Sequence, residues 1–123
     1  MKLTAVAIVI ALIIIALAFY PEASERGNSF SGEIMDSQCA QMGSHQAMML
    51  SHDFTTALEC ALFCAHSQDP RSKFVLFDPA TKTTYQLDDQ DRAQLYAAEK
   101  VTVTGTYDKS TKTIEVANIQ AKP

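Results

Sequence analysis

All three cysteines and all three histidines of this 123-residue chain lie between Cys39 and His66. Thiolate sulfur and imidazole nitrogen are atoms that bind Zn²⁺ and Cu⁺ in proteins. Cys60 and Cys64 are four residues apart, so a helix through them would present both thiols on one face. The sequence therefore offers a tetrahedral copper or zinc site, built from Cys39, Cys60, Cys64 and one histidine, His45 or His66.

Three methionines in the same stretch add soft thioether sulfurs, which favour Cu⁺. They are Met42, Met48 and Met49. Methionine is also a common filler of irregular cores, and this explains the three residues without a metal. The spacing of the cysteines matches no established zinc-finger pattern. The metal site is therefore the alternative hypothesis for this cluster, and the leading hypothesis expects no cofactor.

The leading hypothesis for the same thiols is a disulfide. The apolar N-terminal segment described below would carry them into an oxidising compartment, where thiols that can meet are usually oxidised. Cys39 could pair with Cys60 or with Cys64, and the third thiol would then be left over. Either bond would close a loop of about 20–25 residues and contribute about 3 kcal/mol in the chain-entropy model.

No enzyme motif accompanies the cluster. The chain has no C-x-x-C, no G-x-S-x-G, no phosphate-binding loop and no H-E-x-x-H. Glu33 and Asp36 are explained by a solvated face, and the three aspartates between residues 88 and 91 by a helix cap. The sequence therefore predicts a protein that is not an enzyme.

Two helices are predicted around the cluster and after it. Thr55–Ala65 has helical spacing of its apolar residues, with Thr56 and Glu59 placed as a capping box. Asp88–Ala98 begins with an aspartate cap, and we expect Leu95 and the tyrosine after it to turn inward.

Five stretches of apolar and β-branched residues predict strands. Their order, with a helical excursion after the first strand and a short helix between the third and fourth, is that of a five-stranded OB-like barrel. Gly105, in the fourth strand, fits a position where a tight barrel must bend. The fold class expected is mainly β with α, after a single N-terminal transmembrane helix. The predicted strands are Phe30–Asp36, Lys73–Asp78, Thr83–Leu87, Lys100–Tyr107 and Lys112–Gln120.

Four pieces of sequence occur in a characteristic order: GEIMDSQC, EC-x-x-x-C, FVLFDPATKTTYQLDD and VTVTGTYDKSTKTI. Together they resemble small exported bacterial domains of uncharacterised function that are predicted to be OB-like. The resemblance extends from Phe30 to about Ile119. It implies export and a barrel fold, and it carries no catalytic residue. Such domains usually follow a cleavable signal or a lipid anchor, and the long apolar segment of this chain departs from that arrangement.

That apolar segment, Leu3–Tyr20, follows a single lysine and contains no charge. About eighteen helical residues at roughly 1.5 Å each span about 27 Å, near the lower limit for a bilayer core. The acidic residues that follow place the N-terminus in the cytoplasm and the domain in the periplasm. We expect a retained single-pass anchor, and Ala16–Ala18 leaves a cleaved signal as the alternative.

The chain thus divides into an anchor or uncleaved signal (residues 1–21), a tether (22–29) and an extracytoplasmic OB-like domain (30–120). Lys2 is the single charged residue before position 22, so the exported part carries 9 basic and 14 acidic side chains, a net charge of −5. This charge disfavours nucleic acid as a partner. The function expected is that of a non-catalytic accessory or stabilising subunit of a larger membrane complex, with the membrane and other subunits as partners. Soft-metal binding is the alternative.

Overall fold

The computed structural model describes residues 28–123. The predicted anchor and most of the predicted tether lie outside this range. No helix within residues 28–123 has the length and apolar character needed to cross a bilayer. The strands are β1 (Asn28–Asp36), β2 (Phe74–Asp78), β3 (Thr83–Leu87), β4 (Lys100–Asp108) and β5 (Thr113–Ala121), and the helices are α2 (Ser37–Met42), α3 (Gln46–His52), α4 (Ala57–Ala65) and α5 (Gln90–Gln94).

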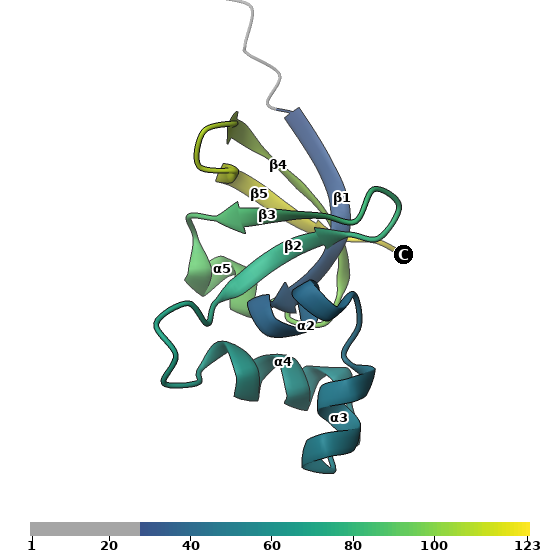
Figure 1. Ribbon diagram of the computed structural model, residues 1–123. Coiled ribbons are helices and arrows are strands. Elements are labelled where there is room, and N and C mark those ends of the chain that lie inside the picture. The colour runs from purple at the N-terminus through teal and green to yellow at the C-terminus, as the bar shows by residue number, and fades with distance from the viewer. Residues whose placement is uncertain (1–27) are drawn as a thin grey trace, which may run out of the picture.

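The five strands close into a barrel in the order β1-β2-β3-β5-β4 (Figure 1). β1 closes the ring because its first part pairs with β4 and its last residues pair with β2. β3 and β5 are parallel, and the other pairs are antiparallel. The predicted mainly β fold of five strands is confirmed, with its helical excursion after the first strand and its short helix between the third and fourth. The first strand begins at Asn28, two residues inside the predicted tether.

Two glycines allow the strands of this small barrel to approach one another. A Cβ atom on Gly105 would collide with the carbonyl oxygen of Glu115 on β5, and the register shifts between Thr104 and Gly105. A Cβ atom on Gly32 would collide with the carbonyl oxygen of Phe77 on β2. Gly105 therefore lies at an irregularity of the barrel wall, as its place in a predicted strand indicated.

β2 is buried on both faces because it separates two apolar clusters. Phe74 and Leu76 belong to the cluster inside the barrel. Val75 and Phe77 belong to a second cluster, formed by the outer side of the barrel wall and the helices. This second cluster contains all three cysteines, so the cysteine side chains of the helical excursion lie where its helices pack on the barrel.

Helices α2, α3 and α4 gather at one end of the barrel, away from the N-terminal end of β1 (Figure 1). α4 begins with the predicted capping box: Thr56 Oγ1 accepts from the Glu59 amide at 3.1 Å, and Glu59 Oε2 accepts from the Thr56 amide at 3.2 Å. These bonds satisfy amide groups that the first turn of a helix leaves without partners.

Thr56→Ala is expected to lower the free energy of unfolding by about 1 kcal/mol, because it removes the cap of α4. Thr56→Ser keeps a hydroxyl in the same place and is the matched control. Urea unfolding of the two variants beside the wild type measures the difference. Equal losses in both variants would show that the hydroxyl is not what matters at this position.

α5 is shorter than predicted and ends at Gln94. Its cap is Asp89, whose carboxylate accepts from the Arg92 amide, as expected for an aspartate in this place. The prediction that Leu95 turns inward is wrong, since its side chain is 75% exposed. The buried positions on this side are Ala93 and Ala97.

Candidate metal centre

The site begins where β1 ends and α2 begins, at Asp36. This residue is fully buried and caps α2: its Oδ1 accepts from the amides of Gln38 at 3.0 Å and Cys39 at 2.9 Å. The cap holds Cys39 on the first turn of α2, directly beside the carboxylate. The earlier assignment of Asp36 to a solvated face is therefore wrong.

His45 reaches the same place from the loop after α2. α2 is capped at its C-terminal end by Gly43, whose φ of 79° lies in the left-handed region that favours glycine. The turn brings the buried ring of His45 against two carboxylates. Its Nδ1 lies 3.7 Å from Asp36 Oδ2, and its Nε2 lies 3.1 Å from Glu33 Oε1.

Cys60 and Cys64 come from one face of α4, as their spacing predicted, and both are buried. The Sγ atoms of Cys39 and Cys60 are 3.6 Å apart. All three cysteines are free thiols, and 3.6 Å is well beyond the roughly 2.05 Å of an S–S bond. The cysteines therefore gather as expected, the predicted disulfide is not formed in the structure, and the thiols of Cys39 and Cys60 are in contact.

Four donor atoms from these elements lie within 4.8 Å of one another, and all four residues are buried. Asp36 Oδ2 and His45 Nδ1, which belong to two of these residues and lie 3.7 Å apart, have no hydrogen-bond partner among residues 28–123. A buried polar atom without a partner costs free energy, and a buried carboxylate costs more. Converging atoms of this kind are the expected lining of a cation site. The group is Asp36, Cys39, His45 and Cys60.

Burial raises the pKa of the Cys39 thiol well above its usual range, and the hydrogen bond and charge of Asp36 raise it further. Burial likewise raises the pKa of Cys64 to about 12, with Asp36 and Cys60 as further causes. These two thiols therefore keep their protons at neutral pH, unlike a catalytic cysteine, whose pKa is lowered. A metal that binds Cys39 has to displace a proton, as is usual for thiolate ligands.

Three of the five ligands proposed from the sequence thus meet in one group: Cys39, Cys60 and His45. Cys64 is buried beside them and outside the four-donor group. His66 is also outside it, and its ring packs edge-on against Phe74 with centroids 5.8 Å apart.

The fourth member, Asp36, was not among the ligands proposed from the sequence. The signal that could have found it is its place at the end of a predicted strand, three residues before Cys39, where an aspartate caps a helix. Of the methionines, Met48 and Met49 are partly buried against the cysteine cluster, and Met42 is exposed.

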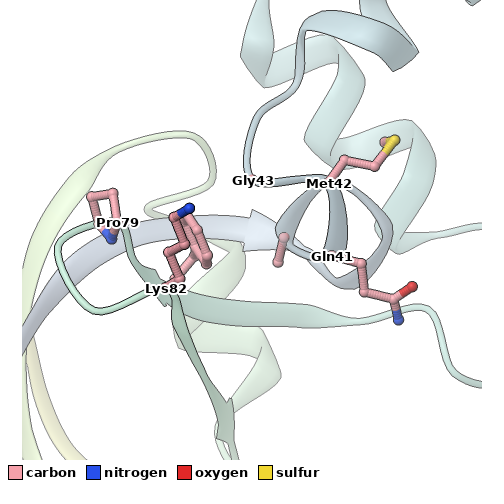
Figure 2. Close-up of a pocket in the computed structure, with 7 residues that line it drawn as sticks. Gln41, Met42, Gly43, Pro79 and Lys82 are labelled. Atoms are coloured by element: carbon pink, nitrogen blue, oxygen red, sulfur yellow. The ribbon is translucent and has the colours of Figure 1, made fainter.

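A surface hollow of about 450 Å³ lies next to the loop that leads to His45 (Figure 2). It is bounded by Met42 and Gly43 at the end of α2 and by Pro79 and Lys82 of the β2–β3 turn. None of the four donor residues lines it. The candidate centre is therefore a buried cluster rather than an open cleft.

No family model, curated protein or solved structure matches this chain.

Proposed function

We propose that this protein is a metal-binding domain on an OB-like barrel. One observation carries the proposal: donor atoms of four buried residues converge, and two of these residues, Asp36 and His45, each have a buried polar atom without a hydrogen-bond partner within residues 28–123. Two features support the OB-like assignment. The five strands form a closed barrel, and along the chain a helical excursion follows the first strand and a short helix lies between the third and fourth. The ligands are Asp36, Cys39, His45 and Cys60.

The donor set favours a divalent cation of intermediate softness, with Zn²⁺ as the best fit. Two sulfurs, one nitrogen and one carboxylate oxygen are all ordinary zinc ligands, and four of them make the tetrahedral site that zinc prefers. The two thiolates and the carboxylate together carry three negative charges, so a divalent ion neutralises the buried site better than Cu⁺ does. A carboxylate is also a hard ligand that Cu⁺ does not favour. Copper would need Cys64 in place of Asp36.

The role that follows is structural or metal-holding rather than catalytic. A site closed by four protein ligands leaves no position for a substrate, whereas catalytic zinc keeps one open. Its ligands come from the end of β1, from α2, from the loop after α2 and from α4. A bound ion would therefore fasten the helical excursion to the barrel.

The disulfide predicted from the sequence competes with the metal for the same atoms. A Cys39–Cys60 bond would consume two of the four donors, so the oxidised protein would be unable to hold the ion in this way. The two states are distinguished by mass and by metal content.

Full-length protein purified from membranes in detergent, without chelator, is expected to carry one zinc per chain and three free thiols. Elemental analysis measures the metal, and intact mass after alkylation under denaturing, non-reducing conditions counts the thiols. The double variant Cys39→Ser/Cys60→Ser should lose the metal, and Cys64→Ser should keep it. A mass lower by two hydrogens, with a single alkylated cysteine and no metal, would replace this proposal with the disulfide.

The accessory-subunit role stays as a second candidate, and one observation favours it. Leu50 on α3 and Leu58 and Phe63 on α4 expose much of their apolar side chains. A subunit that docks on a larger membrane complex needs such a surface. The anchor, the periplasmic location and the absence of nucleic-acid binding stay as parts of this proposal.

A further inference from the structure

His45 faces two different groups with its two ring nitrogens. Nδ1 points to the donor cluster, 3.7 Å from Asp36 Oδ2 and without a hydrogen-bond partner within residues 28–123. Nε2 lies 3.1 Å from Oε1 of Glu33, a residue outside the cluster. A neutral imidazole carries a proton on one nitrogen only, so the partner of one nitrogen decides what the other can do.

We infer that Glu33 is the positioning residue of the metal centre, acting through His45. Its carboxylate accepts a hydrogen bond from Nε2–H, so the ring proton stays on Nε2 and Nδ1 keeps a free electron pair directed at the cluster. Histidines that bind metals usually donate their second N–H to a carboxylate or a carbonyl in this way, and the partner fixes both the tautomer and the orientation of the ring. The role of Glu33 in binding rests on the proposed metal site, whereas the tautomer of His45 does not.

The barrel wall explains why Glu33 is in place to do this. It is the residue at which β1 changes neighbours, since it is paired both with Lys100 on β4 and with Phe77 on β2. The close approach at Gly32, one residue before, belongs to the same crossover. Two residues further on, Met35 packs into the cysteine cluster, and alternation along a strand puts Glu33 on that same face.

Glu33 is also the part of this arrangement that reaches water. Its side chain is 28% exposed, whereas the side chains of His45 and Asp36 are 7% and 1% exposed. A partly exposed carboxylate can complete its hydrogen bonds with water and needs no second protein partner. It can therefore act as a steady acceptor for a buried ring.

A different arrangement would use the same contacts without any metal. A doubly protonated His45 could lie between Glu33 and Asp36 as a buried ion triad. In that case Nδ1 carries a proton and is unable to bind a cation. The two arrangements differ in the protonation of one nitrogen, which is directly observable.

The first test uses full-length protein in detergent, free of metal, kept reduced and labelled with ¹⁵N in histidine. At neutral pH we expect the nitrogen resonances of His45 to show the neutral tautomer with the proton on Nε2. In Glu33→Ala this preference should be lost, while the spectrum of the barrel is retained. A doubly protonated ring, or a proton on Nδ1, in the wild type would overturn the inference whether or not the protein binds metal.

The second test measures Zn²⁺ affinity by competition with a chromogenic chelator. Glu33→Ala is expected to weaken binding by about 10–100-fold, the usual effect of losing such a partner. Glu33→Gln keeps a neutral acceptor and should fall in between, because hydrogen bonds to charged groups are the stronger ones. Glu115→Ala, which removes an exposed carboxylate on β5, should match the wild type.

The outcomes separate the two proposals. Wild-type protein that binds one zinc, together with Glu33→Ala that binds it equally well, would overturn the role of Glu33 and leave the metal site intact. Wild-type protein that binds no zinc would overturn the metal site, and the tautomer of His45 would still decide whether Glu33 orients the ring.

Discussion

Zinc at about one thousand times its Kd should raise the free energy of unfolding of the full-length protein by about 4 kcal/mol. The four ligands come together only in the folded chain, because they lie on β1, α2, α4 and the loop between the helices. An ion held by all four therefore binds the folded state and not the unfolded one. Urea unfolding in detergent with a reductant, with and without added zinc, measures the shift.

Matched serine variants make this result specific. Each variant is compared with itself in the presence and absence of zinc, so its own effect on stability cancels. Cys60→Ser removes a member of the donor group and should abolish the shift, whereas Cys64→Ser, one turn later on α4, should keep most of it. The reverse pattern would place Cys64 rather than Cys60 in the site. A wild type that zinc does not stabilise would contradict the proposed site.

Leu76→Ala should lower the free energy of unfolding by about 2–5 kcal/mol. Leu76 is fully buried on β2, inside the barrel, where the neighbouring strands leave little freedom to fill the space that its side chain vacates. The loss includes both the burial of apolar surface and the cavity that remains. Chemical unfolding of metal-free protein gives the value without a contribution from the site.

Leu95→Ala is the control for this substitution, since it removes the same atoms from a side chain that is 75% exposed. Its effect should stay within about 0.5 kcal/mol, as is usual for surface positions. If the two alanine variants lost similar stability, the inward direction of Leu76 and the outward direction of Leu95 would both be in doubt.

The sequence predicted the elements that local chemistry controls. Alternation and β-branched residues located all five strands to within two residues at each end, and Thr83–Leu87 was located without error. Four consecutive apolar residues from Phe74 predicted a strand buried on both faces, and β2 separates the two clusters. The capping box at Thr56 was also predicted, because both of its partners lie within four residues.

The predictions were wrong where a residue's surroundings come from distant parts of the chain. Leu95 has the apolar character of an inward residue, but α5 ends one residue earlier, and the buried positions on that side are taken by Ala93 and Ala97. Asp36 has the character of a surface residue, but the helices fold over it. Residue type alone does not report on these neighbours.

For the candidate site, the sequence by itself determined the donor types and one pairing. The spacing of Cys60 and Cys64 placed both on one face of a helix, since helical geometry is local. The tertiary structure decided which donors meet. It brought His45 rather than His66 to the thiols, added Asp36, and placed Glu33 behind the ring. The physical reason is that these contacts join parts of the chain that are distant in sequence. They depend on where β1 changes partners as the barrel closes, and on the path of the chain after the turn at Gly43.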